Sequence, residues 1–181
     1  MNKNSLLVGL GNPEKKYEKN RHNIGRNFVI FLAKKWSSSD WENNKKCFAE
    51  ISYINEEDKK IILAKPLVFM NNSGKSIYQL KRFYNIPLKN IFIAQDDADI
   101  NLGDFKISYN RGSAGHNGVK SIIDYLKSKA FYRIRIGIRP FSKIREKAED
   151  FVLKNFTFQE NKILEKLFLI IEEEINNKMK N

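Results

Sequence analysis

The chain has 181 residues, of which 41% are hydrophobic and 12% aromatic, and this excludes a disordered protein and fits one domain with a sizeable core. Its single cysteine, Cys47, excludes an internal disulfide framework, and with only two histidines a structural zinc site is not expected. The formal net charge of +12 raises the hypothesis of a polyanionic partner. We expect Cys47 to be a small buried residue and not a nucleophile.

The positions of the arginines are more informative than the net charge. Because the chain has 25 lysines and 21 asparagines, its basicity could reflect an A/T-rich genome, with lysines solvated on many faces. Five of the eight arginines, however, lie between residues 111 and 145, and residues 104–150 hold 11 basic and 5 acidic side chains. We therefore expect this segment to contact a nucleic acid backbone, with a solvated basic face as the alternative.

The hydrophobic pattern predicts strands and helices mixed along the whole chain. We expect a buried strand at 5–10, a helix at 23–36, a hairpin formed by 48–54 and 60–65, and a helix at 71–84. Further on we expect a short strand at 91–94, a strand at 104–109, a helix at 117–127, a strand at 133–139 and an amphipathic helix at 159–178. No repeat or linker interrupts this order, so residues 1–181 are predicted to form one α/β domain.

The sequence predicts a cytoplasmic protein. The N-terminus leads into the first strand without the apolar region of a signal peptide. No apolar run approaches the roughly 20 residues that a membrane helix needs.

Both histidines lie in His-Asn dipeptides flanked by glycine, in Arg21-His22-Asn23-Ile24-Gly25 and Gly115-His116-Asn117-Gly118. Imidazole changes protonation near neutral pH, so it suits proton transfer, and amides supply neutral donors for a polar substrate or an oxyanion. A surface position is the alternative for either histidine. Two histidines in matching contexts favour a site.

The first turn presents a further amide. Gly9-Leu10-Gly11 resembles the start of a dinucleotide-binding fingerprint, but the third glycine is missing and Pro13 follows, so we do not expect a Rossmann cofactor. The turn places Asn12 after a strand, where α/β sheets bind ligands. Its alternative role is that of a turn-forming residue before proline. Asn71 or Asn72 could likewise be a helix N-cap.

Asp96 follows a buried strand and is well placed to accept a hydrogen bond from a histidine Nδ1–H, which would strengthen His22 as a base. A metal site formed by Asp96, Asp97 and Asp99 is a second interpretation. A serine nucleophile is a third, but no serine lies in a G-x-S-x-G elbow; the available residues are Ser5, Ser73, Ser113 and Ser121. The pattern favours a water molecule activated by histidine.

Taken together, these motifs resemble those of the bacterial-type peptidyl-tRNA hydrolase family. The matching segments are Val8-Gly9-Leu10-Gly11-Asn12-Pro13 with Tyr17, Arg21-His22-Asn23-Ile24-Gly25, Lys65-Pro66 with Phe69-Met70-Asn71 and Ser73-Gly74, Asp96-Asp97-Ala98-Asp99, Gly115-His116-Asn117-Gly118 with Lys120-Ser121-Ile122, Arg133-Ile134-Arg135-Ile136-Gly137-Ile138 and Phe151-Val152-Leu153. They occur in the family's order over residues 6–170.

The resemblance implies a monomeric α/β enzyme without metal or cofactor, whose twisted mixed sheet is surrounded by helices. Such an enzyme cleaves the ester between a peptide and the terminal ribose of tRNA, and it recognises the acceptor end with its 5′ phosphate. By the same resemblance, His22 activates water and Asp96 orients it. The substrate-binding residues implied are Asn12, Tyr17, Met70, Asn71, His116 and Asn117, and the tRNA-binding residues are Lys106, Arg133 and Arg135.

The sequence departs from the family in four places. Glu14 replaces a glycine, Asn20 replaces a threonine and Gln95 replaces a histidine, and the tail after residue 153 is short. Glu14 could change the turn, and the short tail leaves the gate of the peptide groove undefined. Two other functions remain as alternatives: a noncatalytic RNA-binding relative, and a basic nucleotide-binding domain, which the broken glycine fingerprint disfavours.

Overall fold

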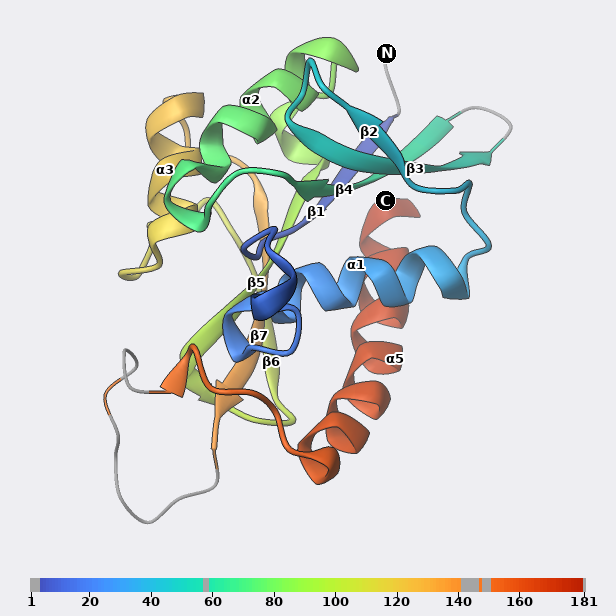
Figure 1. Ribbon diagram of the computed structural model, residues 1–181. Helices are drawn as coiled ribbons and strands as arrows, with labels where there is room; N and C mark the ends of the chain where they lie inside the picture. The colour runs from blue at the N-terminus through green and yellow to red at the C-terminus, as the bar shows by residue number, and fades with distance from the viewer. Residues whose placement is uncertain (1–3, 57–58, 141–146, 148–150, 181) are drawn as a thin grey trace.

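The computed structural model describes residues 4–56, 59–140, 147 and 151–180 (Figure 1). The strands are β1 (Ser5–Gly9), β2 (Glu42–Asn44), β3 (Ala49–Glu56), β4 (Lys59–Pro66), β5 (Ile91–Asn101), β6 (Phe105–Tyr109) and β7 (Tyr132–Arg139). The α-helices are α1 (Ile24–Lys35), α2 (Ser73–Phe83), α3 (Asn117–Leu126) and α5 (Phe158–Lys180). Short 3₁₀ turns lie at Lys15–Tyr17, Arg21–Asn23, Met70–Asn72 and Leu88–Asn90.

The seven strands form one mixed sheet in the order β2-β3-β4-β1-β5-β7-β6. The four central strands, β4, β1, β5 and β7, run parallel, and β2, β3 and β6 pair antiparallel at the two edges. The carboxyl ends of the parallel strands therefore meet at one edge of the sheet, where α/β proteins place their ligands. The predicted α/β class with a mixed sheet surrounded by helices is confirmed.

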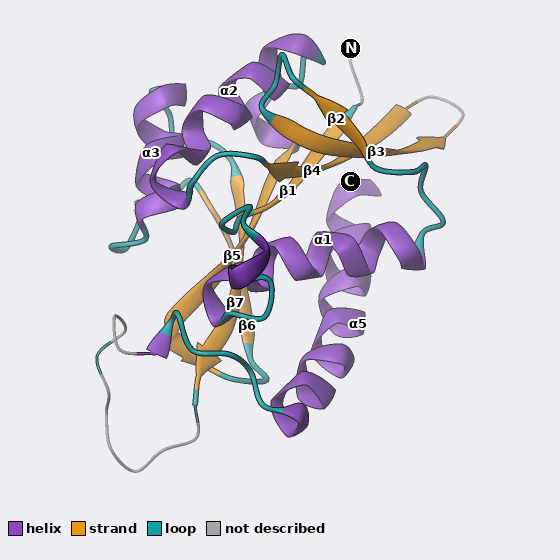
Figure 2. Cartoon of the chain, in the orientation of Figure 1, coloured by secondary structure: helices purple, strands orange, loops and turns teal. Residues whose placement is uncertain are grey.

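Helices cover both faces of the sheet, with α2 and α3 on one side and α1 and α5 on the other (Figure 2). Successive residues of β1 consequently enter different cores: Leu6 and Val8 pack on the side of α2 and α3, and Leu7 packs on the side of α1 and α5. All three are fully buried. This two-sided burial explains why β1 is a continuous apolar run and does not alternate with polar residues.

The predicted helices and the hairpin of β3 and β4 are confirmed, with bounds that differ by a few residues. Part of the predicted hairpin turn, residues 57–58, lies outside the described residues. The short polar strand β2 was not predicted, because Glu42–Asn44 offers no apolar alternation. Cys47 is buried, as expected.

The prediction for 91–94 was wrong in length, since β5 continues through the acidic cluster to Asn101. Its register with β7 shifts between Asp97 and Asn101. At Gly137 the two backbones approach so closely that a Cβ atom would lie 2.0 Å from the Asn101 carbonyl oxygen. The strand tolerates its carboxylates because arginines of β7 pair with them: Arg135 with Asp97 and Arg139 with Asp99.

Candidate active site

Close backbone packing brings the first His-Asn motif to the carboxyl ends of β1 and β5. The Leu10 N–H donates to the Ala94 carbonyl over 2.9 Å. At Gly25, in the first turn of α1, a Cβ atom would lie 2.2 Å from that same carbonyl oxygen. Only glycine permits this approach. The 3₁₀ turn that holds His22 is therefore fixed directly above the sheet.

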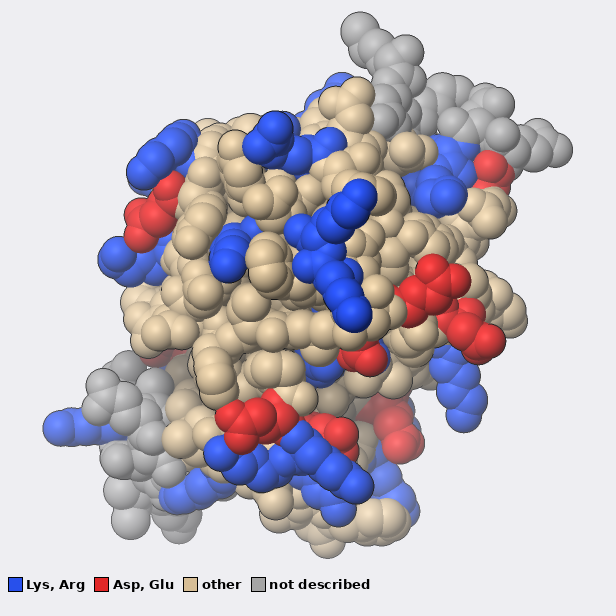
Figure 3. All heavy atoms as spheres, turned by 45° about the horizontal axis from the view of Figure 1, so that its top comes forward, with Lys and Arg blue, Asp and Glu red and all other residues tan. Residues whose placement is uncertain are grey.

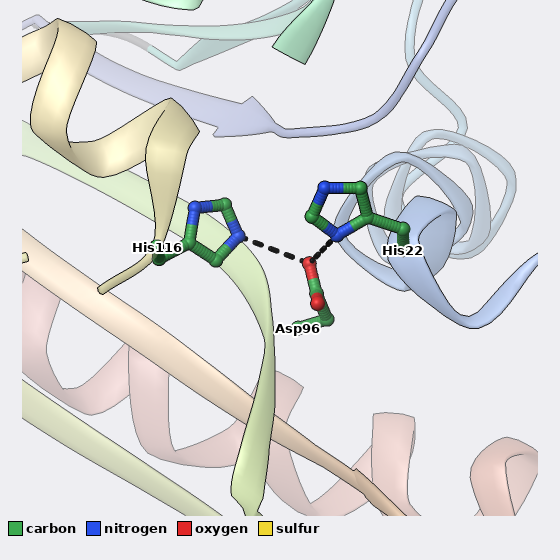
Figure 4. A group of neighbouring side chains, drawn as sticks. All are labelled: His22, Asp96 and His116. Atoms are coloured by element: carbon green, nitrogen blue, oxygen red, sulfur yellow. Dashed lines mark hydrogen bonds and ion pairs between the residues drawn. The ribbon is translucent and has the colours of Figure 1, made fainter. Parts of the chain in front are cut away.

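The two histidines converge on one carboxylate oxygen (Figure 4). His22 Nδ1 lies 2.8 Å from Asp96 Oδ1, and His116 Nε2 lies 3.0 Å from the same atom. Asp96 lies on β5 and His22 lies in the turn before α1. His116 is the residue that precedes α3. The hydrogen bond from His22 to Asp96 is the one that the sequence predicted.

The hydrogen bonds around His116 determine which ring nitrogens carry protons. The Val119 N–H donates to His116 Nδ1 over 3.3 Å, so Nδ1 is an acceptor and the proton is on Nε2, which donates to Asp96. His22 donates to Asp96 through Nδ1–H, which leaves its Nε2 unprotonated in the neutral ring. His22 Nε2 is then free to act as a base.

Charge and burial act in opposite directions on this cluster. Burial alone would raise the pKa of Asp96, but the two imidazoles outweigh it through charge and hydrogen bonds and hold that pKa well below its usual range. Burial alone would lower the pKa of His22, but the Asp96 carboxylate outweighs it, and the pKa of His22 lies above its ordinary value of 6.5. Asp96 is therefore ionised at neutral pH and strengthens His22 as a base.

A cleft of about 530 Å³ opens beside His22. Its lining combines amides with apolar side chains: Asn12, His22, Phe69, Met70, Asn71 and Asn117. Asn12 is held rigidly, because its Oδ1 accepts from the Met70 N–H over 2.9 Å and so aligns the side-chain amide. The structure thus brings Asn12, Met70, Asn71 and Asn117 together with His22, although they come from three distant segments of the chain.

Asn23 supports the site and was not assigned a role from the sequence. Its Oδ1 accepts from the Asn12 N–H and its Nδ2 donates to the Asn12 carbonyl, each over 2.9 Å. Asn23 is fully buried. Its place in the first His-Asn dipeptide was the signal that could have identified it.

Two predicted substrate-binding residues do not line this cleft. The described cleft lining does not include Tyr17 or His116. Tyr17 ends a 3₁₀ turn, where Lys16 Nζ lies 4.9 Å from its ring centroid. The His116 side chain is 8% exposed, and both of its nitrogens bond within the protein. The sequence resemblance alone did not reveal that His116 is a partner of Asp96.

The hypothesis that Asn71 or Asn72 is a helix N-cap is confirmed for the position of Asn72 but not for a side-chain bond. Asn72 is the residue before α2, but its side chain makes no capping hydrogen bond there. Asn71 is exposed at the cleft. Because Asn72 and not Asn71 is the N-cap residue of α2, helix capping does not explain why Asn71 lies at the cleft.

Arg133 was expected to contact tRNA, but the structure buries it, with only 2% of the residue exposed. Its Nε donates to Gln95 Oε1 over 2.9 Å, and its Nη atoms donate to the Gly112 and Ser113 carbonyls. Alternation along β7 correctly placed it on the face opposite the isoleucines. The burial arises because the 110–115 loop covers that face.

Lys106 and Arg135 remain accessible. They lie directly opposite each other in the β6–β7 pair, so their side chains share one face of the sheet. Lys106 is exposed, whereas the Arg135 side chain is 24% exposed and its Nε lies 2.7 Å from Asp97 Oδ2. Arg145, part of the arginine-rich segment, lies outside the described residues. On the face shown in Figure 3, lysines and arginines form several separate groups, and acidic side chains border some of them.

The predicted acidic metal site is not supported by these contacts, because Asp97 and Asp99 pair with arginines. A different set, His22, Asp96 and His116, has ligand atoms within 4.8 Å of one another. In the observed arrangement, however, both histidines use N–H groups toward Asp96. A metal ion would have to replace both protons and break the bond from Val119 to His116, since a metal-bound Nε2 requires Nδ1–H.

Two of the four candidate serines, Ser73 and Ser121, have structural contacts. Ser73 Oγ donates to the Met70 carbonyl, and Ser121 Oγ accepts from the Gly74 N–H. The described lining of the cleft includes no serine.

None of the described helices is both long and apolar enough to cross a membrane.

A mixed α/β sheet that presents a carboxylate-oriented imidazole beside an amide-lined cleft has the groups that hydrolytic chemistry requires. A family model described as peptidyl-tRNA hydrolase matches residues 6–181. The chain belongs to the peptidyl-tRNA hydrolase family.

Individual relatives agree over almost the whole chain. The peptidyl-tRNA hydrolase of Rickettsia bellii (strain OSU 85-389) is 41% identical, and the match covers 96% of this chain and 98% of that protein. The peptidyl-tRNA hydrolase of Bacillus cytotoxicus is 43% identical, with 94% and 92% covered. The structure of peptidyl-tRNA hydrolase from Acinetobacter baumannii matches with a TM-score of 0.81 and 32% identity, over 99% and 94% of the two chains.

Proposed function

We propose that this protein hydrolyses the ester bond between a peptide and the terminal ribose of tRNA, with His22 as the general base. The observation that carries the proposal is the hydrogen bond from His22 Nδ1 to buried Asp96, which leaves Nε2 as an acceptor in an amide-lined cleft. The family's substrate, peptidyl-tRNA, supplies an ester that such a base can hydrolyse. The released peptide and tRNA would both become available for reuse.

In the proposed reaction, His22 Nε2 takes a proton from water while the water oxygen bonds to the ester carbonyl carbon. The carbonyl oxygen becomes an oxyanion, which the amide donors of Asn12, Asn71 or Asn117 stabilise. When the tetrahedral intermediate collapses, the bond to the ribose oxygen breaks, and the His22 imidazolium returns its proton to that oxygen. Asp96 stabilises the imidazolium between the two steps and remains ionised.

The expected contributions to the rate are large enough for ester hydrolysis. A positioned general base contributes about 10²–10⁴-fold in rate. Each oxyanion donor contributes on the order of 10²–10³-fold. The cleft offers three amides, and the apolar side chains of Phe69 and Met70 lie beside them.

We propose Lys106 and Arg135 as the tRNA-binding pair, facing the acceptor end with its 5′ phosphate. Both project from one face of the β6–β7 edge, close in the sheet to Asp96 of β5. Cationic side chains at this position attract phosphates by charge alone, without reading the base sequence. The protein is proposed to act in the cytoplasm as a monomer, without an obligate protein partner, metal or cofactor.

The test is the release of labelled peptide from N-blocked aminoacyl-tRNA, with EDTA present, by the wild type and by His22→Ala. Fast hydrolysis by the wild type, with loss of about 10²-fold or more in the variant and nearly unchanged tRNA binding, is expected. Near-full turnover by the variant would contradict the role of His22. Tight tRNA binding by the wild type without turnover would instead indicate the noncatalytic RNA-binding relative.

A further inference from the structure

Arg133 is among the largest fully buried side chains of the described chain, and its hydrogen-bond partners are neutral. Nε donates to the Gln95 side-chain carbonyl, and the Nη atoms donate to the carbonyls of Gly112 and Ser113. Burying a guanidinium is costly unless its donors are satisfied. Arginine suits this position because its planar group presents five N–H donors in a fixed fork, which lysine cannot reproduce.

The loop that Arg133 contacts has an unfavourable backbone. Asn110 and Ala114 both adopt positive φ, at 54° and 50°, although neither is glycine. Such conformations persist only where surrounding contacts hold them. The Arg133 bonds to Gly112 and Ser113 lie between these two positions and supply such contacts.

The same loop leads directly to the second His-Asn motif. The Ser113 carbonyl, which accepts from Arg133, also accepts from the His116 N–H over 3.1 Å. His116 then caps α3 through Val119 and donates to Asp96, and Asn117 lines the cleft. The loop conformation therefore sets where His116 and Asn117 stand.

Gln95 connects Arg133 to strand β5 next to Asp96. It precedes Asp96 in β5, and its side chain accepts from Arg133 Nε while its own Nε2 donates to the Asp96 carbonyl over 3.2 Å. One buried guanidinium thus joins the strand that carries Asp96 to the loop that carries its partner His116.

We infer that Arg133 is a positioning residue, which holds the 110–115 loop on β5 so that His116 meets Asp96 and Asn117 faces the cleft. The inference rests on the proposed function for its kinetic consequences. Burial, with the nearby charge of Arg135, lowers the pKa of Arg133 to about 10, so the side chain remains a charged donor at neutral pH. Arg133 acts on the reaction through the loop and makes no contact with tRNA.

The test compares Arg133→Lys with Arg135→Gln, two positions on one strand. Lysine keeps the charge but loses the fork, so we expect kcat to fall by about 10- to 100-fold through misplacement of the loop. KM and the salt dependence of tRNA binding should stay at wild-type values. Arg135→Gln should show the opposite pattern, with raised KM, a flatter salt dependence and little change in kcat.

Gln95→Met provides a second variant if Arg133→Lys folds poorly. It keeps Arg133 and removes the two Gln95 side-chain contacts, the acceptor for Arg133 Nε and the donor to the Asp96 carbonyl, so kcat should fall with KM unchanged. Circular dichroism and thermal unfolding establish that each variant is folded. A raised KM and flatter salt dependence in Arg133→Lys, with kcat unchanged, would overturn the inference and return Arg133 to phosphate binding.

Amide hydrogen exchange gives a readout that does not depend on catalysis. We expect faster exchange at the His116 and Val119 amides in both Arg133→Lys and Gln95→Met, because their acceptors are held by the loop. If the wild type does not hydrolyse peptidyl-tRNA, the proposed function fails, while this measurement still decides the positioning role. Unchanged exchange in both folded variants would contradict it.

Discussion

His22 and His116 share one hydrogen-bond acceptor, Oδ1 of Asp96, and their ring centroids lie 5.4 Å apart with planes at 37°. A carboxylate that accepts a hydrogen bond from one histidine alone stabilises the protonated form of that histidine fully. Here Asp96 also accepts a hydrogen bond from His116, so it stabilises protonated His22 less. His116 is therefore placed to moderate how strongly Asp96 raises the pKa of His22.

His116→Asn tests this relationship, because asparagine is a good N-cap but is too short to replace the ring between Val119 and Asp96. With one donor removed, Asp96 should raise the pKa of His22 further above 6.5. Since the base must be neutral, the acidic limb of the pH profile of kcat/KM should move to higher pH. We expect the loss of activity to be largest near pH 6 and smallest above pH 8.

The measurement is kcat/KM for peptide release from pH 5.5 to 9. His116→Ala is the control for capping, because alanine can neither cap α3 nor donate to Asp96. Relative to His116→Asn, it should lose about 1 kcal/mol more of the free energy of unfolding. An acidic limb that stays in place in both variants would show that His116 does not influence His22.

Arg135→Gln is expected to weaken tRNA binding through the loss of one phosphate contact. The slope of log K against log salt concentration should become shallower by about 0.7–0.9. Binding titrations between low and physiological salt measure this slope. Lys34→Gln, which removes one charge from the exposed end of α1, is the matched control and should leave the slope unchanged. Equal slopes for the wild type and Arg135→Gln would place the phosphate contacts elsewhere.

Local chemistry made much of the site predictable from the sequence. His22, Asp96 and Asn12 each follow or flank a strand or turn whose pattern is clear, and the parallel order of β1 and β5 brings their ends together. The pairing of Asp96 with His22 follows from that geometry. The second donor, His116, could not be inferred in the same way, because its ring orientation depends on a hydrogen bond within α3.

Arg133 illustrates what alternation cannot determine. A period of two assigns Arg133 and Arg135 to one face of β7, but it does not indicate which part of that face a distant loop covers. The 110–115 loop buries Arg133 and leaves Arg135 partly accessible. Likewise, β5 extends past Ala94 because arginines of β7 neutralise its carboxylates, and that cross-strand pairing appears only in three dimensions.

Gly25→Ala should destabilise the protein strongly. The added Cβ would lie 2.2 Å from the Ala94 carbonyl oxygen, so α1 would have to move away from the strand ends. Overpacking costs typically about 1–3 kcal/mol, and we expect the upper end because the neighbour is backbone. Gly112→Ala is the control, since nothing lies within 4 Å of its Cβ position. Urea unfolding should give a change within about 0.5 kcal/mol for the control. Similar losses in the two variants would contradict the explanation by close approach.

The position of His22 also depends on the segment that leads into α5 and on the start of that helix. His22 N–H donates to the Val152 carbonyl over 2.9 Å, and the neighbouring Arg21 forms two 2.8 Å hydrogen bonds to Glu160. Glu160 and Thr157 cap the helix reciprocally, with the Thr157 N–H bonded to Glu160 Oε2 and the Glu160 N–H bonded to Thr157 Oγ1. One carboxylate therefore fixes both the helix start and the turn that contains His22.

Glu160→Gln should remove about 3 kcal/mol of stability and lower kcat, because it leaves the buried Arg21 guanidinium without its counter-ion. Burial alone would raise the pKa of Glu160, but the bonds from Thr157 and Arg21 outweigh it and lower that pKa below 4.5. A lowered carboxyl pKa contributes stability above the unfolded value, and this contribution is lost as the pH falls through the folded value. The difference between wild type and variant should thus be constant from pH 6 to 8 and shrink below about pH 4.5.

Urea unfolding at pH 4 and pH 7 measures this difference. Asp124→Asn is the matched control, since its pair with Lys120 is exposed, with side chains 57% and 69% accessible, and such pairs contribute at most about 1 kcal/mol. A loss in Glu160→Gln no larger than in Asp124→Asn would mean that the Arg21 pair does not anchor the turn. A large loss accompanied by unchanged kcat would separate the stability of this contact from the placement of His22.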